Sequence, residues 1–128
     1  MNRSEFEHSI QTAIADLPER IRKALNNVAF LVEGGERQPP HGTKGIRRGR
    51  VLLGLYEGVP LVARGAGYQW VLPDRITLFK DVIEELAGHD DEQVRTVVRD
   101  TVRHEIAHHL GFSELEVREW EKKRKRAS

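Results

Sequence analysis

The sequence predicts a single α+β domain in which helices and short strands share one hydrophobic core. Three observations predict this class. The length of 128 residues suits one modest core. Short apolar runs rich in branched residues predict strands, and apolar stripes at helical spacing predict helices. We expect the domain to cover residues 1–121 and a basic tail to cover residues 122–128.

The first third of the chain is predicted to hold two helices and one strand. Ser4 and Glu7 form a capping-box pattern that opens the first helix. Pro18 favours the start of a second, short helix. The run Val28–Val32 predicts a buried strand. The apolar stripe of the first helix comprises Phe6, Ile10, Ala13, Ile14 and Leu17.

Residues Glu33–Arg50 are predicted to form one long loop. The stretch contains five glycines, two prolines and several basic residues. Loops of this length in a small domain are usually either functional or disordered. His41 in this loop is therefore one candidate metal ligand, although no sequence signal fixes the backbone around it.

Two further strands are predicted at Val51–Tyr56 and Asp74–Phe79. Gly58 and Pro60 mark a turn, after which Leu61–Ala63 can continue as a hairpin arm. We place Asp74–Phe79 at an edge of the sheet, where an extended peptide could pair with it by strand addition.

The C-terminal third is predicted to be helical. Lys80–Ala87 predicts a short helix that Gly88 ends. Asp90 or Asp91 then caps a long helix, and Gly111 takes the left-handed position that ends it. Ser113 opens a last helix over Glu114–Arg126.

The long helix ends in the stretch HEIAHHLG, residues 104–111, whose residue types and spacing indicate a metal site. His104 and His108 lie one turn apart on the same helix face, so their imidazoles can hold one zinc ion (Zn²⁺). Glu105 at the edge of that face can take a proton from a zinc-activated water. The residues before the motif form an apolar arc that continues into it: Val94, Val97, Val98, Thr101 and Val102.

This arc suggests a physical reason for a metal. Glu105 and His108 fall within the arc, and His104 falls at its edge. We therefore expect these polar groups to face the core, where burial without a partner would cost several kcal/mol. A bound metal ion would supply the partner.

A catalytic zinc ion needs three protein ligands and one open position. A turn at Gly111 would bring Glu114 back toward the metal, so we favour Glu114 as the third ligand. The competing carboxylates are Glu116 and Glu119. His109 points about 100° away from His108, so we expect it to lie beside the ligands or in the core rather than on the metal. Tyr68 is a candidate donor to the oxyanion.

Three stretches of the chain, in order, resemble a known family: LLGLYEGVPL at 52–61, LPDRITLF at 72–79 and VRDTVRHEIAHHLG at 98–111. They are similar to the small bacterial zincin-like metallopeptidases, which are minimal single-domain HExxH proteins. The resemblance implies a zincin-like α+β fold with a small mixed sheet packed against the HExxH helix. It also implies zinc bound by His104 and His108, with Glu105 as the base.

The sequence departs from the family at two places. The family has an acidic residue, usually Asp, three positions after the glycine, and this chain has Glu114 there. The sole methionine is Met1, so no methionine follows the motif to form a Met-turn.

The composition limits the compartment and the partners. The absence of cysteine excludes disulfides and thiolate metal sites and fits a cytoplasmic location. No apolar run is long enough to span a membrane, and the polar first residues do not form a secretory signal. The net charge of +1 hides a basic end, because five Lys and Arg residues occupy positions 122–126.

The leading hypothesis is a zinc-dependent peptidase that acts on a peptide or protein. The first alternative is a metal-dependent, RNA-associated hydrolase, for which the basic run Lys122–Arg126 and Arg47, Arg48 and Arg50 could contact phosphates. The second alternative is a non-catalytic interaction module that zinc stabilises. The oligomeric state stays open.

Overall fold

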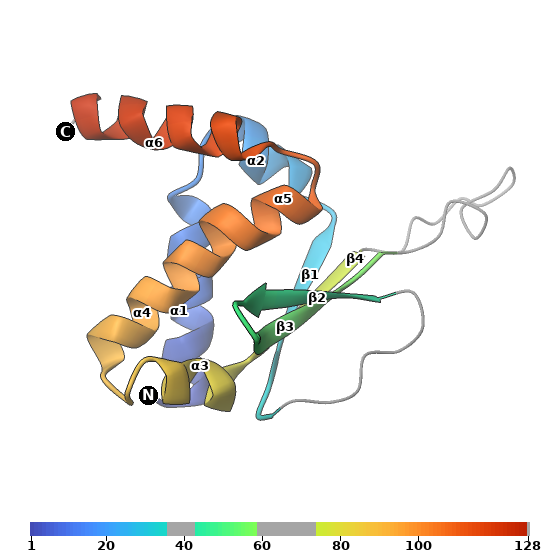
Figure 1. Ribbon diagram of the computed structural model, residues 1–128, viewed down its shortest axis with the longest axis vertical. Helices are drawn as coiled ribbons and strands as arrows, with labels where there is room; N and C mark the ends of the chain where they lie inside the picture. Colours follow the sequence, from blue (N-terminus) through green and yellow to red (C-terminus); the bar gives the residue numbers. More distant parts are fainter. Residues whose placement is uncertain (36–42, 59–73, 128) are drawn as a thin grey trace, which may run out of the picture.

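The computed structural model describes residues 1–35, 43–58 and 74–127. It has the predicted α+β architecture, with helices packed on a four-stranded mixed sheet (Figure 1). The elements in chain order are α1 (Arg3–Ala15), α2 (Glu19–Ala24), β1 (Val28–Glu33), β2 (Thr43–Arg48), β3 (Val51–Glu57), β4 (Asp74–Phe79), α3 (Lys80–Leu86), α4 (Asp91–Asp100), η2 (Thr101–Ile106), α5 (Ala107–His109) and α6 (Glu114–Ala127).

The strand order of the sheet is β1-β4-β3-β2. β1 pairs with β4 in parallel, whereas β4–β3 and β3–β2 are antiparallel. The prediction that Asp74–Phe79 lies at an edge is therefore wrong. Pairing with β1 on one side and β3 on the other places β4 inside the sheet, and its Ile76, Leu78 and Phe79 are fully buried. Within the described residues, the edge strands are β1 and β2.

The predicted loop Glu33–Arg50 contains a strand that the sequence analysis missed. Residues Thr43–Arg48 form β2, which joins β3 through a turn at Gly49 and Arg50. Gly49 adopts a φ of 60°, which a glycine tolerates at no steric cost. Ile46 is the one buried side chain of β2, so pairing with β3, rather than an apolar pattern, holds this strand in place.

A β-bulge lies in β3 opposite the second half of β2. Ile46 pairs with Gly54 and Arg47 pairs with Leu52, which makes Leu53 the extra residue. Gly54 also permits close packing of β3 on β4, because a Cβ there would lie 2.2 Å from the carbonyl oxygen of Thr77. The bulge places Leu53 in the core, where it is 1% exposed.

The first helix begins earlier than predicted. Asn2, not Ser4, is the N-cap of α1, and its side chain accepts a hydrogen bond of 2.8 Å from the backbone N–H of Glu5. Asparagine caps a helix as well as serine does, so the chain can start the helix at Arg3. The second helix begins after Pro18, as predicted.

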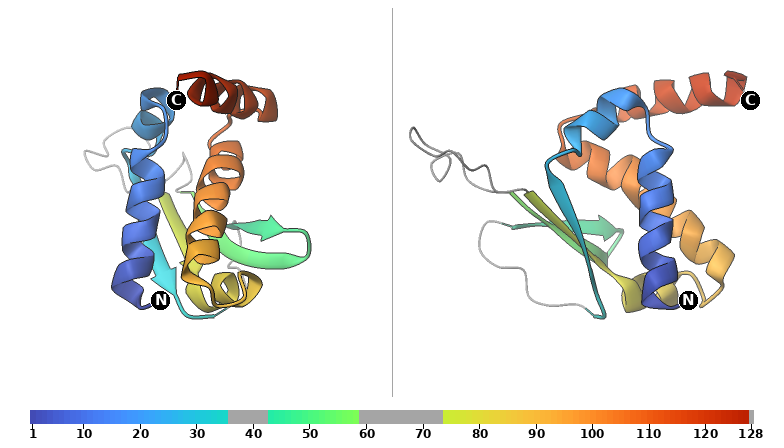
Figure 2. Two further views of the ribbon diagram at one scale, coloured as in Figure 1. Left: turned by 90° about the vertical axis from the view of Figure 1, so that its left-hand side faces the viewer. Right: turned by 180° about the vertical axis from the view of Figure 1, so that it is seen from behind.

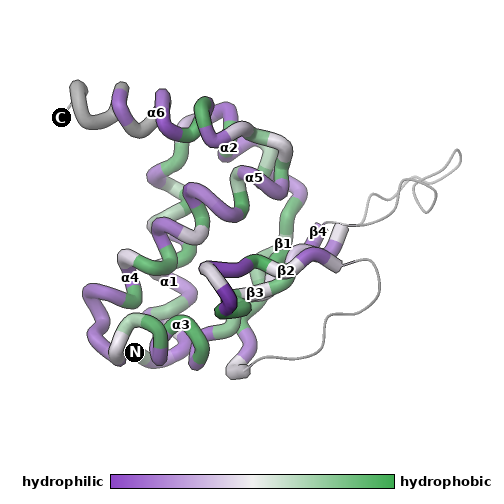
Figure 3. The backbone as a smooth tube through the Cα atoms, in the orientation of Figure 1, coloured by the Kyte–Doolittle hydropathy of each residue, from purple (hydrophilic) through white to green (hydrophobic). Residues whose placement is uncertain are grey.

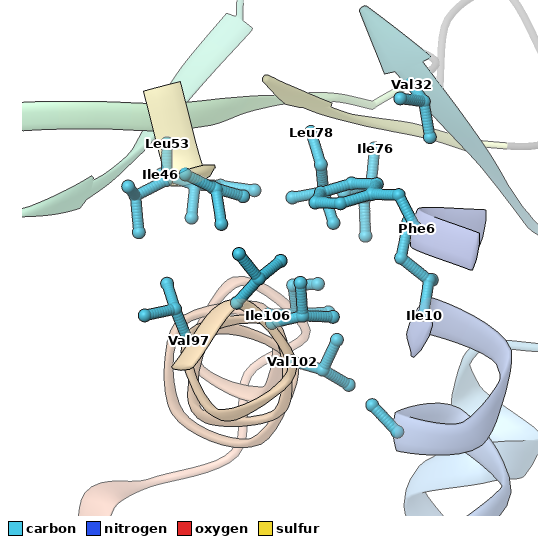
Figure 4. Packing of buried hydrophobic residues seen from close by; sticks show 14 of the residues in the cluster. Phe6, Ile10, Val32, Ile46, Leu53, Ile76, Leu78, Val97, Val102 and Ile106 are labelled. Carbon is cyan, nitrogen blue, oxygen red and sulfur yellow. The ribbon is translucent and has the colours of Figure 1, made fainter. Parts of the chain in front are cut away.

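The core lies between the sheet and two helical segments, α1 and the motif helix formed by α4, η2 and α5. These segments lie side by side on one face of the sheet in all three views (Figures 1 and 2). Side chains of the sheet and the helices point toward one another there (Figure 4). The fully buried members include Ile46, Ile76, Leu78, Val94, Val98, Val102 and Ile106, together with Phe6 of α1.

The motif helix is continuous but not regular. Asp90 caps it through a 3.1 Å bond from the N–H of Glu92, and Gly111, with a φ of 94°, follows its last turn, both as predicted. The predicted α-helix is interrupted, however, by the π-helical segment η2. Val98, Val102 and Ile106 are spaced four residues apart and are all fully buried. In an α-helix, which has 3.6 residues per turn, this spacing would move successive side chains gradually around the helix and away from the core. The wider π-helical turn offsets this rotation.

The last helix opens at Ser113, as predicted. Its hydroxyl accepts a 3.1 Å bond from the N–H of Glu116, and the helix then runs to Ala127. The described helices include none that is long and apolar enough to cross a membrane. The division into a domain at 1–121 and a tail at 122–128 stays a prediction. The predicted hairpin arm Leu61–Ala63 lies outside the described residues.

Candidate metal centre

A cavity of 260 Å³ opens between the motif helix and the β2–β3 hairpin. The motif residues His104 and Glu105 line it together with Glu114 from the start of α6. Three of the four predicted site residues therefore share one cavity. The other lining residues are Arg48, Leu53, Asp100 and Thr101.

His104 and Glu105 lie in η2, and both are half-buried. Single π-helical turns occur frequently at functional sites, because the extra residue changes the direction of the side chains that follow. Here the buried positions pass to Ile106 and Ala107, and the polar side chains turn toward the cavity.

The expectation that these polar groups face the core is therefore wrong. The side chain of His108 is 40% exposed. The apolar arc does continue as far as Val102, as predicted. After that point the change of helical turn rotates the polar side chains of the motif out of the core, while Ile106 and Ala107 stay buried. Burial of unpaired polar groups therefore does not argue for a metal here.

His108 is bonded to Glu114 at 2.7 Å, between Nε2 and Oε2. Since a carboxylate only accepts, the Nε2–H of His108 is the donor. Glu114 also accepts from Nε of Arg118 at 3.2 Å. The hydrogen bond from His108 is the main cause that lowers the pKa of Glu114 below its ordinary value. Desolvation opposes it, and the hydrogen bond from Arg118 adds a smaller lowering effect. The turn at Gly111 thus brings Glu114 to the motif, as predicted.

The competing carboxylates have other positions. Oε1 of Glu116 accepts from the Ser113 hydroxyl at 3.3 Å, and Oε2 lies 3.4 Å from Arg20. Glu119 is exposed on α6. Neither residue lines the cavity that holds His104, Glu105 and Glu114.

His109 contacts the strands instead of the cavity. Its Nδ1 lies 2.6 Å from the backbone oxygen of Glu105, and its ring lies 5.5 Å from that of Tyr56. The Tyr56 hydroxyl in turn donates to Oδ2 of Asp74 at 2.6 Å. This series of contacts links the backbone at Glu105 to β3 and β4. Sequence reasoning identified none of Arg48, Asp100, Tyr56 or Asp74 as part of the site.

The candidate donors suit zinc in kind. Two imidazoles and one carboxylate form a common ligand set for catalytic zinc. His104 and Glu114 line one cavity, and His108 touches Glu114. In the part of the chain that the structure describes, however, no three His, Asp or Glu side chains are gathered closely enough to hold a metal ion as they stand. His41 and Tyr68, the other candidates, lie outside the described residues.

Comparison with known proteins adds one finding. A family model described as zincin-like metallopeptidase matches residues 25–124, which span all the described strands and the whole motif helix. A comparison with curated proteins gives no match.

Proposed function

The chain belongs to the zincin-like metallopeptidase family, and on this premise we propose that it is a zinc-dependent peptidase that hydrolyses peptide bonds. The observation that carries the proposal is the shared cavity of His104, Glu105 and Glu114, with His108 bonded to Glu114 at its margin. A candidate general base and candidate metal ligands thus lie around one cavity.

His104, His108 and Glu114 are the residues that would hold the metal. When bound, zinc supplies a Lewis acid that polarises the substrate carbonyl and lowers the pKa of water to about 7. His108 now uses its Nε2–H to donate to Glu114. Ligation through Nε2 requires this nitrogen to be free of its proton, which in a neutral imidazole means that the ring carries the proton on Nδ1 instead.

Glu105 is the proposed general base. It is half-buried and lines the cavity, so water can reach its carboxylate. It would accept the proton of the attacking water and then pass it to the leaving amine. The contact of His109 with the Glu105 carbonyl, at 2.6 Å, fixes the backbone from which this carboxylate projects.

β2 is the proposed docking strand for the substrate. It is an edge strand within the described sheet, and it borders the cavity through Arg48. An edge strand offers unpaired backbone donors and acceptors to an extended peptide. This replaces the expectation of strand addition at β4, which lies inside the sheet.

Glu105→Gln tests the proposal. We expect turnover of a peptide library to fall roughly 10²- to 10⁴-fold, the usual contribution of general acid–base catalysis. Zinc content by elemental analysis should stay the same, whereas His108→Ala should lower it. Glu119→Gln, on the exposed face of α6, is the matched control and should change neither quantity. Unchanged turnover in the Glu105 variant would contradict the proposal.

A non-catalytic zinc-stabilised module is the second candidate. It is favoured by the short His108–Glu114 contact, since a metal ion held by these two residues would join α6 to the motif helix and stabilise the fold without any reaction. The same experiment separates the two functions, because a module has no turnover for Glu105→Gln to remove.

A further inference from the structure

We propose that Arg48 makes the site selective for peptides with an acidic side chain beside the scissile bond. The inference rests on the proposed peptidase function and names the class of substrate. Its structural basis is that Arg48, on the edge strand β2, lines the same cavity as His104 and Glu105.

The strand geometry directs Arg48 toward the site. Alternate residues of a strand share one face, so Arg48 is on the face of Ile46, which is fully buried against the motif helix. Arg48 accordingly reaches Asp100, the last residue of α4, with Nη2 at 3.7 Å from Oδ2. Asp100 directly precedes η2 and also lines the cavity.

The pairing with Asp100 leaves Arg48 available. The contact is long, and the two side chains are 51% and 33% exposed. Surface pairs of this kind are weak and exchange readily with other partners. Asp100 has a second cation nearby, Nε of Arg99 at 4.0 Å, so Arg48 can turn to a substrate without leaving this carboxylate isolated.

Three carboxylates, Asp100, Glu105 and Glu114, line the cavity, so Arg48 is the group in this lining that can attract an anionic side chain. Glu114 already accepts from His108 and Arg118, and Asp100 already has two arginines. Arg48 is the one Lys or Arg among the described lining residues. A guanidinium binds a carboxylate in a two-pronged geometry, which makes it selective for Asp and Glu side chains.

A peptide fits this place better than a nucleic acid does. Figure 3 shows that β2 ends in a hydrophilic stretch and that a second hydrophilic segment follows the pale turn toward β3. The edge of β2 can hydrogen-bond an extended peptide backbone while Arg48 contacts one side chain. The described lining of the cavity includes no Phe, Tyr or Trp side chain on which a base could stack.

The test measures binding and cleavage separately. In the Glu105→Gln protein with zinc, fluorescence anisotropy would give the affinities of three labelled octapeptides that differ only by Glu, Gln or Lys at one position. The position is scanned on both sides of the central bond. We expect the Glu peptide to bind roughly tenfold more tightly than the Gln peptide at one position. Arg48→Gln should remove this preference, and Asp100→Asn should increase it.

Arg47→Gln is the matched control. It removes the same charge from the neighbouring residue, but Arg47 lies on the other face of β2, where its side chain approaches Gly45 and Leu52 is adjacent. This variant should keep the preference for Glu. An equal loss in both arginine variants would overturn the inference, because the effect would then be one of net charge. A Glu-to-Gln ratio that Arg48→Gln leaves unchanged would overturn it too.

Two further outcomes are decisive. Absence of measurable binding of the Glu peptide at millimolar concentration overturns the inference, as does tighter, Arg48-dependent binding of a uridine oligonucleotide. If the Arg48-dependent preference is found but the unaltered protein cleaves no peptide, the acidic-peptide site stands and the peptidase proposal fails. If peptides are cleaved without regard to acidic residues, the peptidase proposal stands and the inference about acidic peptides fails.

Discussion

The two halves of the motif helix pack on the same sheet, but different interactions fix them. The first half, α4, buries Val94, Val97 and Val98 and is capped by Asp90. The second half, η2 with α5, also buries aliphatic side chains, but it presents His104 and Glu105 to a cavity and leaves His108 exposed. The boundary between the two halves is the change from α-helical to π-helical turns at Thr101.

The difference shows how one helix can serve both stability and a site. Ionic groups beside the first half are already engaged with one another: Glu84 of α3 contacts Lys80 at 3.1 Å and the Met1 amino group at 3.3 Å, and that amino group lies 3.4 Å from Asp91. In the second half, by contrast, the contact of His108 with Glu114 lies at the surface, where the two side chains are 40% and 48% exposed. The following experiments test this contrast.

The largest expected effect comes from Ile106→Ala in the second half. Ile106 is fully buried, so its truncation should cost about 2–5 kcal/mol of unfolding free energy. Leu115→Ala, at a position 66% exposed, should cost less than about 0.5 kcal/mol. Urea denaturation measures both. Equal, small losses would show that the second half does not depend on its apolar contacts.

The next effect concerns zinc. At a zinc concentration of 100 times the dissociation constant, a folded-state site stabilises the protein by about 2.7 kcal/mol. We expect His108→Ala to remove this gain, while the metal-free stability changes by less than about 0.5 kcal/mol because the side chain is exposed. Thermal unfolding with zinc and with a chelator measures both values. A zinc gain that survives in the variant would argue against His108 as a ligand.

Acid should weaken the first half of the helix through Glu84. Burial alone would raise the pKa of Glu84, but the hydrogen bond from Lys80 and the ion pair with the Met1 amino group outweigh it and hold the pKa below its ordinary value. The folded-state pKa is thus the lower one, so the stabilisation is present above pH 4.5 and is lost as the pH falls through the folded-state pKa.

Glu84→Gln measures that contribution. It should cost about 1.5–3 kcal/mol at pH 7, as expected for hydrogen bonds to charged groups. The difference from the unaltered protein should shrink in urea titrations carried out below pH 4. Glu85→Gln, at the exposed neighbouring position, is the control. A difference that is the same at both pH values would mean that Glu84 acts through packing alone.

The same contrast explains what could be predicted from the sequence. The aliphatic stripe of α4, the cap at Asp90 and the turn at Gly111 depend on local residue types, and all three were predicted. The approach of Glu114 to His108 follows from that turn and was predicted too. The role of these residues as zinc ligands stays a prediction.

The missed features depend on tertiary contacts. β2 has one buried side chain, Ile46, and owes its conformation to pairing with β3, so no pattern within Thr43–Arg48 indicates it. The interior position of β4 follows from its parallel pairing with β1, which is distant in the chain. The π-turn has no residue signature, and without it the motif was predicted to face the core. Arg48 joined the site only once β2 was known to be a strand.

The smallest expected effect tests the link between the second half and the sheet. Tyr56→Phe removes the 2.6 Å hydrogen bond to Asp74 but keeps the ring that packs on His109. We expect a loss of about 1 kcal/mol of stability, the net value of one hydrogen bond. Turnover should stay within about twofold, since the contact of His109 with the Glu105 carbonyl does not involve the hydroxyl. Tyr56→Leu removes the ring as well and should lower kcat further at equal zinc content. If the two variants had the same kcat, the packing of Tyr56 on His109 would have no part in positioning Glu105, and the second half of the helix would hold its site through η2 alone.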